Sequence, residues 1–389
     1  MNLITANAKE GQVLPQSNIA GKPVLTVSTR IVNPASDFAE KGLCNGPTFS
    51  AGSACVYTCR YCYVEPIMNR GGSAVWETLH KAKLAFQDVV IRRENPLQHL
   101  RAELRNNRGK LRYKYDERTV YASPVVDVAA TIELARETTD LCLEILGSTG
   151  WSIRLLSKSP FLLRIASVLP AQWRHRIIFG LSTGTFDEEV AKAIEPDAPS
   201  PTKRLQALEE LQKEGFRTFA MLCPILPQDP EAFVKQATQR INLDACEHVW
   251  AEVLNRRGAS MQRTHQALNG ANLTSWAQQL RGVFGKDSTS AWEAYARGIF
   301  RALADVVPAG KLRFLQYVTP RSRHWWENEK SHGAILLGKN ATPVTVKKTA
   351  DLQQKAKRRA AALKAWETIR KNRQMAAAGS PSSPMAKRK

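Results

Sequence analysis

The stretch Cys55-Val-Tyr-Thr-Cys59-Arg-Tyr-Cys62-Tyr63 places three thiols within eight residues. Three thiolates fill only three of the four positions around a tetrahedral zinc ion. Either a fourth ligand comes from elsewhere in the chain, or one coordination position stays open. A cubane iron–sulfur cluster held by three cysteines is the second case, because its fourth iron can bind another molecule. The spacing therefore predicts a metal centre on Cys55, Cys59 and Cys62.

A structural zinc site is the alternative interpretation of the same motif. It would recruit Cys44 upstream or His80 downstream as the fourth ligand. Zinc ligands usually come as two separated pairs, and the sequence shows no second pair. A disulfide framework is disfavoured, because the seven cysteines are an odd number in 389 residues that begin without a secretory signal. We therefore expect a reducing, cytoplasmic environment.

Composition and charge indicate the kind of protein and its partners. Hydrophobic residues make up 43% of the chain, enough for a large core, and no apolar run approaches the roughly 18 residues that span a bilayer. We expect no membrane partner. The net charge of +21 favours a polyanion such as nucleic acid. Residues 347–389 hold thirteen Lys or Arg against two acids, so this tail is either a nucleic-acid contact or a solvated basic segment.

Strand-like and helix-like segments alternate through the middle of the chain, which is typical of βα units with parallel strands. No early Gly-rich dinucleotide fingerprint is present, so we expect an α/β partial (β/α)6 TIM-type barrel with functional residues at the C-terminal ends of its strands. We expect an N-terminal arm over 1–40, the barrel over 41–256, a helical and strand extension over 257–342, and the basic tail over 343–389. Strands are expected at 47–50, 86–91, 119–122, 152–156, 176–181, 218–223, 248–253 and 312–317, and 86–91 could instead continue the preceding helix.

The CxxxCxxC spacing, with Tyr61 before the third cysteine, resembles the signature of the radical S-adenosylmethionine (SAM) enzymes. In that family a 4Fe-4S cluster binds the amino and carboxylate groups of SAM at its free iron. A cluster electron then cleaves a sulfonium bond and releases a 5′-deoxyadenosyl radical, which abstracts hydrogen. The resemblance also implies a reducing partner of the flavodoxin or ferredoxin kind.

Several further segments resemble the spore photoproduct lyase-like subgroup, often labelled DNA repair photolyases. The similarity covers roughly residues 45–255. The segments are Ala122-Ser123-Pro124 with Asp127, Ser157-Lys158-Ser159-Pro160, Leu181-Ser182-Thr183, Glu195-Pro196 with Arg204, and Cys223-Pro224-Ile-Leu-Pro227.

The resemblance implies a cofactor site at these segments. Lys158 or Arg204 would neutralise the SAM carboxylate, and Ser182 and Thr183 would bond the ribose. Main-chain groups beside Tyr61 would meet the adenine, and Ser123 falls in the polar turn after the second strand. Each of these residues also has an ordinary structural role open to it, such as a helix cap or a surface ion pair.

One departure from the subgroup concerns the hydrogen donor. The spore photoproduct lyases proper have a cysteine after the second strand, where this chain has Ala122 and Ser123. Cys223, at the end of an expected strand, is a substitute donor or a small core residue. Tyr63, beside the cluster motif, would carry a radical or pack. Photoproduct repair itself is therefore not expected.

The segment Pro320-Arg-Ser-Arg-His-Trp-Trp326 mixes cations with paired indoles. It would stack on bases and pair with phosphates, or its indoles would belong to the core. We expect a radical SAM enzyme with nucleic acid as its first-choice substrate or docking partner. A peptide or small-molecule substrate is one alternative, and a non-catalytic zinc- or cluster-containing nucleic-acid-binding protein is another.

Overall fold

The structure is a computed structural model that describes residues 18–34, 36–68, 73–113, 116–122, 124–255, 259–285, 288–308 and 310–338. These residues all belong to the compact unit Met1–Gly338, and Lys339–Lys389 forms a second unit. The expected basic tail lies outside the described residues. Within the described part of the chain, no helix has the length and apolar character needed to cross a membrane.

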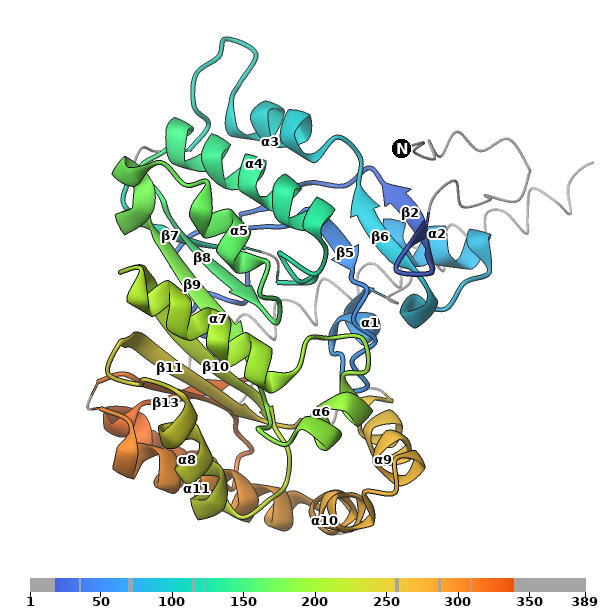
Figure 1. The fold of residues 1–389 in the computed structure, drawn as a ribbon, viewed down its shortest axis with the longest axis vertical. Coiled ribbons are helices and arrows are strands. Elements are labelled where there is room, and N and C mark those ends of the chain that lie inside the picture. The colour runs from blue at the N-terminus through green and yellow to red at the C-terminus, as the bar shows by residue number, and fades with distance from the viewer. Residues whose placement is uncertain are drawn as a thin grey trace, which may run out of the picture. The chain divides into compact units, whose positions relative to one another are not determined.

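The main sheet has nine strands in the order β13-β12-β11-β10-β9-β8-β7-β4-β3 (Figure 1). All neighbours pair in parallel except β3 and β4. From β4 to β11 six strands follow chain order, which confirms the expected α/β partial barrel, and β12 and β13 extend it. Their bounds are β3 Val32–Asn33, β4 Thr48–Phe49, β7 Thr119–Ala122, β8 Ser152–Ser157, β9 Ile177–Ser182, β10 Arg217–Ile225, β11 Cys246–Val253, β12 Leu312–Tyr317 and β13 Ala334–Leu337.

Helices cover the outer face of this sheet (Figure 1). Several begin at a side-chain cap: Thr131 accepts a hydrogen bond from Leu134 N, and Asp229 accepts one from Ala232 N. Such caps satisfy amide groups that the first turn leaves without partners. The helices of the barrel are α3 Pro96–Leu104, α4 Ile132–Ser148, α5 Leu162–Ser167, α6 Glu188–Ile194, α7 Pro201–Lys213 and α8 Pro230–Arg240, with the 3-10 turn η2 Ala171–Arg176.

A second, four-stranded sheet lies beside the barrel in the order β1-β2-β6-β5. Its strands are β1 Asn18–Ile19, β2 Lys22–Val27, β5 Gly52–Ala54 and β6 Val90–Arg93, and the helices α1 Val64–Met68 and α2 Ala74–Ala82 lie between β5 and β6 in the chain. The strand expected at 86–91 starts later, because Phe86–Asp88 forms the 3-10 turn η1. A β-carbon on Gly52 would lie 2.6 Å from Ile91 O, so only glycine lets β5 approach β6 this closely. β5 ends directly before Cys55.

Residues 38–44 fill the interior of the open barrel. The Phe38 ring stacks on Tyr121 of β7 with 5.2 Å between centroids. The indole Nε1 of Trp250 donates to Lys41 O at 3.1 Å, and Arg154 Nη1 donates to Leu43 O at 2.5 Å. This segment packs with inward-facing side chains of β8 to β13 in one buried cluster. Part of the region expected to be an arm therefore contributes to the core of the barrel.

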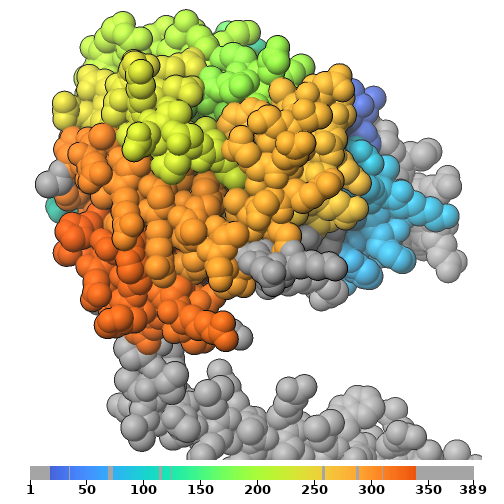
Figure 2. Space-filling view, turned by 90° about the horizontal axis from the view of Figure 1, so that it is seen from below, coloured from blue at the N-terminus to red at the C-terminus, as the bar shows by residue number. Residues whose placement is uncertain are grey.

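The helices after residue 259 pack against the barrel on one face (Figure 2). They are α9 Ser260–Gly270, α10 Thr274–Phe284, α11 Ser288–Val306 and α12 Arg323–Asn328, with the 3-10 turn η3 Glu329–His332. Side chains of α9 and α10 form a buried cluster with Val190 and Ile194 of α6. Tyr61 of the cysteine motif packs against the same cluster. The C-terminal helices thus reach the predicted metal centre.

The indole of Trp326 is fully buried, which corrects the expectation that both indoles could stack on bases. It lies parallel to Phe314 with 5.6 Å between ring centroids, and its Nε1 donates to Glu293 Oε2 at 2.8 Å. Trp325 packs edge-on against it and carries Arg297 on its face. The core interpretation of this segment is correct for Trp326, because its side chain is 0% exposed.

Candidate functional site

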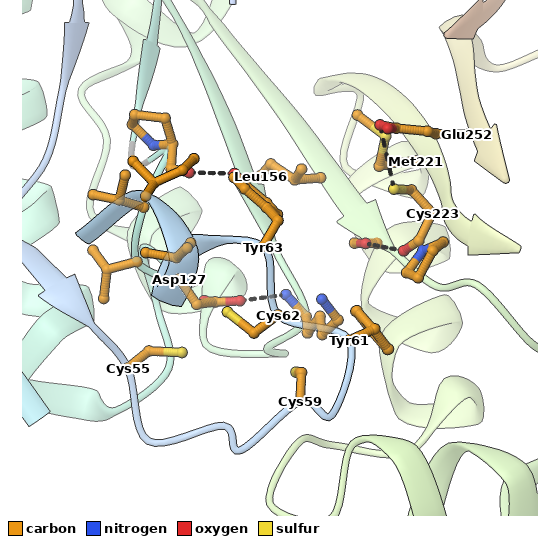
Figure 3. Close-up of a pocket in the computed structure, with 18 of the residues that line it drawn as sticks. Cys55, Cys59, Tyr61, Cys62, Tyr63, Asp127, Leu156, Met221, Cys223 and Glu252 are labelled. Carbon is orange, nitrogen blue, oxygen red and sulfur yellow. Dashed lines mark hydrogen bonds between the residues drawn. The ribbon is translucent and has the colours of Figure 1, made fainter. Parts of the chain in front are cut away.

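The three cysteines of the motif lie on one loop at the wall of a single cavity of about 300 Å³ (Figure 3). The loop follows β5 and ends at α1. Main-chain groups hold its middle, since Arg60 N donates to Ile194 O at 2.8 Å and Cys62 N donates to Cys59 O at 3.1 Å. The structure therefore brings Cys55, Cys59 and Cys62 together as the sequence predicted.

Because the three thiols are largely buried, they stay protonated unless a positive group lies close enough to stabilise a thiolate. Burial raises the pKa of Cys55 to about 11, and it raises the pKa of Cys59 and of Cys62 above the usual value for a thiol. All three are free thiols. A thiolate in such a place requires a positive partner, and a bound metal supplies one. The loop is thus suited to a metal rather than to a reactive free cysteine.

Among the described residues, no three His, Cys, Asp or Glu side chains are arranged to hold one metal ion. Neither Cys44 nor His80 lines the cavity, so the zinc site considered from the sequence lacks its fourth ligand there. In a cubane cluster each thiolate binds a different iron, so its ligands lie farther apart than the ligands of a single ion. Three thiols on one loop at the cavity wall have the chemistry of such a cluster.

Cations anchor the loop from both sides. Lys22 Nζ donates to Val56 O at 2.8 Å and lies 3.9 Å from the Asp197 carboxylate, which accepts a hydrogen bond from Thr58. On the other side Arg263 Nε donates to Arg60 O at 3.1 Å. Each cation therefore bonds a carbonyl of the loop, and positive charge lies close to the site that an anionic cluster would occupy.

The C-terminal end of β8 forms the next part of the cavity wall. The Asp127 carboxylate accepts hydrogen bonds from Ser157 Oγ at 2.5 Å and from Lys158 N at 2.7 Å. Lys158 Nζ lies 5.7 Å from the ring centroid of Tyr61 and 3.8 Å from Glu195 Oε1. Asp127 thus fixes the turn that points Lys158 into the cavity.

Behind this wall lies a buried ion pair. The Arg204 guanidinium pairs with the Glu195 carboxylate and donates to Ser182 O at 3.0 Å and to Pro199 O at 2.7 Å. Their side chains are 1% and 3% exposed. Burial raises the pKa of Glu195, and the Arg204 charge opposes that rise. The pair connects α6, α7 and the end of β9.

The sequence-predicted cofactor residues separate into two groups. Tyr61, Lys158 and Ser182 line the cavity. Arg204 and Thr183 lie behind its wall, because the Arg204 donors are directed to Glu195 and two carbonyls, and Thr183 Oγ1 donates to Thr185 O at 2.6 Å. Arg204 supports the strand end that carries Ser182 and does not itself face the cavity. The prediction for Ser123 falls outside the described residues.

The end of the cavity opposite the cysteine loop is formed by β10 and β11 (Figure 3). Cys223 Sγ donates to Glu252 Oε2 at 3.8 Å, and Asn255 Nδ2 donates to Glu252 Oε1 at 2.7 Å. Lys41 Nζ lies 3.8 Å from the same carboxylate. Tyr63 lines the space between the two ends, and its hydroxyl donates to Pro124 O.

Several site residues were not predicted from the sequence. Glu252 and Asn255 stand at the end of a predicted strand, a position that could have indicated them. Lys22 and Arg263 come from segments outside the expected barrel, Lys41 is its first expected residue, and no local pattern marks any of the three. Their place in the site depends on contacts between residues far apart in the chain.

Fold and site together define an α/β protein with a partial parallel barrel and a three-thiol cavity at the C-terminal rim of its strands. No family model matches the sequence. An uncharacterized protein of Methanocaldococcus jannaschii is 25% identical over 173 residues, which are 44% of this chain and 58% of that protein. The match thus spans less than two thirds of the archaeal protein. An uncharacterized protein of Acidianus two-tailed virus is 24% identical over 260 residues, 62% of this chain and 78% of that protein.

Solved structures resemble the chain at the level of fold. A mutant of spore photoproduct lyase with bound AdoMet and dinucleoside spore photoproduct matches with a TM-score of 0.49 and 14% identity, over 76% of this chain and 82% of that chain. Native anSMEcpe with bound AdoMet and a peptide matches with a TM-score of 0.32 and 11% identity, over 68% and 67%.

Proposed function

We propose that this chain is a radical SAM enzyme that carries a 4Fe-4S cluster on Cys55, Cys59 and Cys62 and uses SAM to abstract hydrogen. The carrying observation is that the three thiols lie on one loop at the wall of one cavity. When bound, the cluster and SAM would supply a 5′-deoxyadenosyl radical. The remaining steps depend on what the residues of this chain bind, orient and exclude.

The residues present fit a cluster and a charged cofactor. The Tyr61 hydroxyl is buried and has no hydrogen-bond partner among the described residues, although it borders the cavity. A buried polar atom of this kind indicates a partner that the protein does not itself provide. Lys158 would hold the cofactor carboxylate, and Ser182 would bond its ribose. A cavity of about 300 Å³ is at the lower end of the range for small-molecule sites.

Cys223 is our proposed hydrogen donor at the far end of the cavity. Burial raises the pKa of this thiol, with the nearby Glu252 carboxylate adding to the effect, so the S–H bond that a donor needs is retained. In the proposed step the S–H bond breaks, a C–H bond forms on the carbon radical, and the unpaired electron stays on Cys223 sulfur. Tyr63, which lines the cavity between Cys223 and the cysteine loop, would release its hydrogen bond to Pro124 O and return a hydrogen atom from its hydroxyl to that sulfur. The unpaired electron would then lie on the Tyr63 phenoxyl oxygen.

The first test is anaerobic reconstitution with iron and sulfide, followed by reduction with SAM present and chromatography for 5′-deoxyadenosine. Wild type should form it and Cys59→Ala should not. Cys246→Ala is the matched control, because this buried thiol lies outside the cavity lining. No deoxyadenosine from wild type, together with stoichiometric zinc, would overturn the proposal and favour the non-catalytic binding protein.

The same reaction in heavy water tests the role of Cys223. Its S–H exchanges to S–D, so deoxyadenosine formed without substrate should gain deuterium in wild type and lose most of that label in Cys223→Ala. An unchanged label would show that Cys223 is out of reach.

We further propose nucleic acid as the substrate or docking partner, supported by the net charge of +21. Binding to DNA or RNA should fall steeply with salt, and the slope should decrease on truncation at about Pro343. A salt-independent affinity would instead favour a peptide or small-molecule substrate.

A further inference from the structure

Arg263 belongs to α9, in the helical part that follows the barrel, and its guanidinium reaches the loop that carries the three cysteines. Its Nε donates to Arg60 O at 3.1 Å, and its Nη1 pairs with the Glu65 carboxylate at the start of α1. With the amide of Gln87 oriented to satisfy its hydrogen bonds, the Gln87 oxygen accepts from Nε at 2.9 Å and from Nη2 at 3.2 Å. One side chain therefore joins the cysteine loop, α1 and η1.

The shape of the guanidinium explains why these three partners can be joined at once. Its five donors point outward from one rigid plane, whereas a lysine ammonium is a compact charge with three donors. The Arg263 and Glu65 side chains are only 20% and 23% exposed, so water competes weakly for these bonds. A lysine at this position would keep the positive charge but could not make most of these directed hydrogen bonds.

The charge of Arg263 also lies close to the proposed cluster. Arg263 Nε donates to the carbonyl of Arg60, a residue between Cys59 and Cys62, so the guanidinium lies against the part of the loop that carries these two thiols. Reduction adds an electron, and nearby positive charge stabilises the more negative state. Lys22 also bonds a carbonyl of this loop, that of Val56, whereas Lys158 faces the cavity and is expected to contact cofactor.

We propose that Arg263 is a positioning residue that holds the cysteine loop for the cluster and makes the bound cluster easier to reduce. This inference rests on the proposed cluster on Cys55, Cys59 and Cys62. It assigns a part of the metal site to α9, a helix outside the barrel. Arg263 does not line the cavity, so it acts through the loop and through its charge.

The test compares Arg263→Gln and Arg263→Lys with Arg281→Gln, an exposed arginine of α10 that contacts His265. The reconstituted proteins are titrated with reductant, without turnover, and the reduced cluster is followed by electron paramagnetic resonance. At the wild-type midpoint, Arg263→Gln should have a reduced-to-oxidised ratio about tenfold lower, which is a shift of about 59 mV for one electron. Arg263→Lys should stay within about twofold of wild type, because it keeps the charge.

Loop positioning is measured separately on the metal-free proteins by amide hydrogen exchange over residues 59–65. Both Arg263 variants should exchange severalfold faster than wild type, and Arg281→Gln should not. Wild-type exchange rates and midpoint in Arg263→Gln would overturn the inference. Failure of wild type to take up a cluster would instead overturn the proposed function, and the exchange experiment would still decide the positioning role.

Discussion

Replacing Arg204 by methionine should destabilise the protein in a pH-dependent way. The substitution keeps the volume of the side chain but leaves the Glu195 carboxylate buried, with Lys158 Nζ at 3.8 Å as its remaining cation. Removing one partner of a buried ion pair costs about 3–5 kcal/mol. Ser182 O and Pro199 O also lose a charged donor. We expect the free energy of unfolding to fall by about 4 kcal/mol at pH 8.

The pH dependence follows from the direction of the Glu195 pKa shift. Burial raises this pKa in the folded protein, and the loss of Arg204, which lowers it, should raise it further. The folded variant then binds a proton more tightly than the unfolded chain does. Lowering the pH through the folded pKa therefore stabilises the variant, by about 1.4 kcal/mol for each unit of pKa difference. At pH 5 the deficit relative to wild type should be smaller than at pH 8 by at least about 1 kcal/mol.

Urea unfolding of the metal-free proteins, followed by tryptophan fluorescence at pH 5 and pH 8, measures both effects. Lys203→Met is the matched control, because Lys203 is the preceding residue of α7 and is exposed. We expect the control to change stability by less than about 0.5 kcal/mol. A loss below about 1 kcal/mol in Arg204→Met, or an equal loss at both pH values, would refute the buried-pair argument.

Three further changes test other parts of the structure. Gly184→Ala should cost about 3 kcal/mol or more in urea unfolding, because its β-carbon would lie 1.9 Å from the backbone oxygen of Pro224; a wild-type midpoint would contradict this close approach. Trp326→Phe should cost about 1.5–3 kcal/mol, because the Glu293 carboxylate loses its indole donor, and the same denaturant titration measures it. His248 has its pKa lowered to about 4, chiefly by burial, so stability should fall by about 1 kcal/mol as pH drops from 6.5 to 4, after allowance for its partial exposure. His248→Gln should flatten that dependence in thermal melts across this range.

Local sequence patterns predicted the bounds of those strands whose conformation is determined mainly by their own residues. The strands Thr119–Ala122 and Leu312–Tyr317 match their expected bounds, since short runs of apolar and aromatic residues between turns leave few alternatives. The segment Phe86–Asp88 was wrongly expected to be a strand, because its apolar spacing does not distinguish a strand from a short 3-10 turn. The strand Ala334–Leu337 was missed, since a four-residue run carries little periodicity, and only pairing with β12 defines it.

In the candidate site, too, local patterns predicted some features, and others depend on tertiary packing. The cysteine spacing predicted one loop, and Lys158 and Ser182 were predicted at strand ends, where the structure has them. Arg204 was predicted on the cavity and lies behind it, because nothing in the helix pattern shows that Glu195 is buried beside it. Position along a strand can be inferred from sequence, whereas the direction in which a charged side chain finds its partner depends on tertiary packing.

The order of the strands explains why the site needs segments from both ends of the described chain. β4 belongs to the main sheet and β5 to the small sheet, so the chain changes sheets at Ser50 and Ala51, one short strand before the cysteine loop. The loop therefore leaves the barrel rim and is held by Lys22 from the small sheet and by Arg263 from α9. A chain cut to residues 41–256 would keep all three cysteines and lose both of these cations. The motif marks the metal centre, but its geometry is a property of the barrel, the small sheet and the C-terminal helices together.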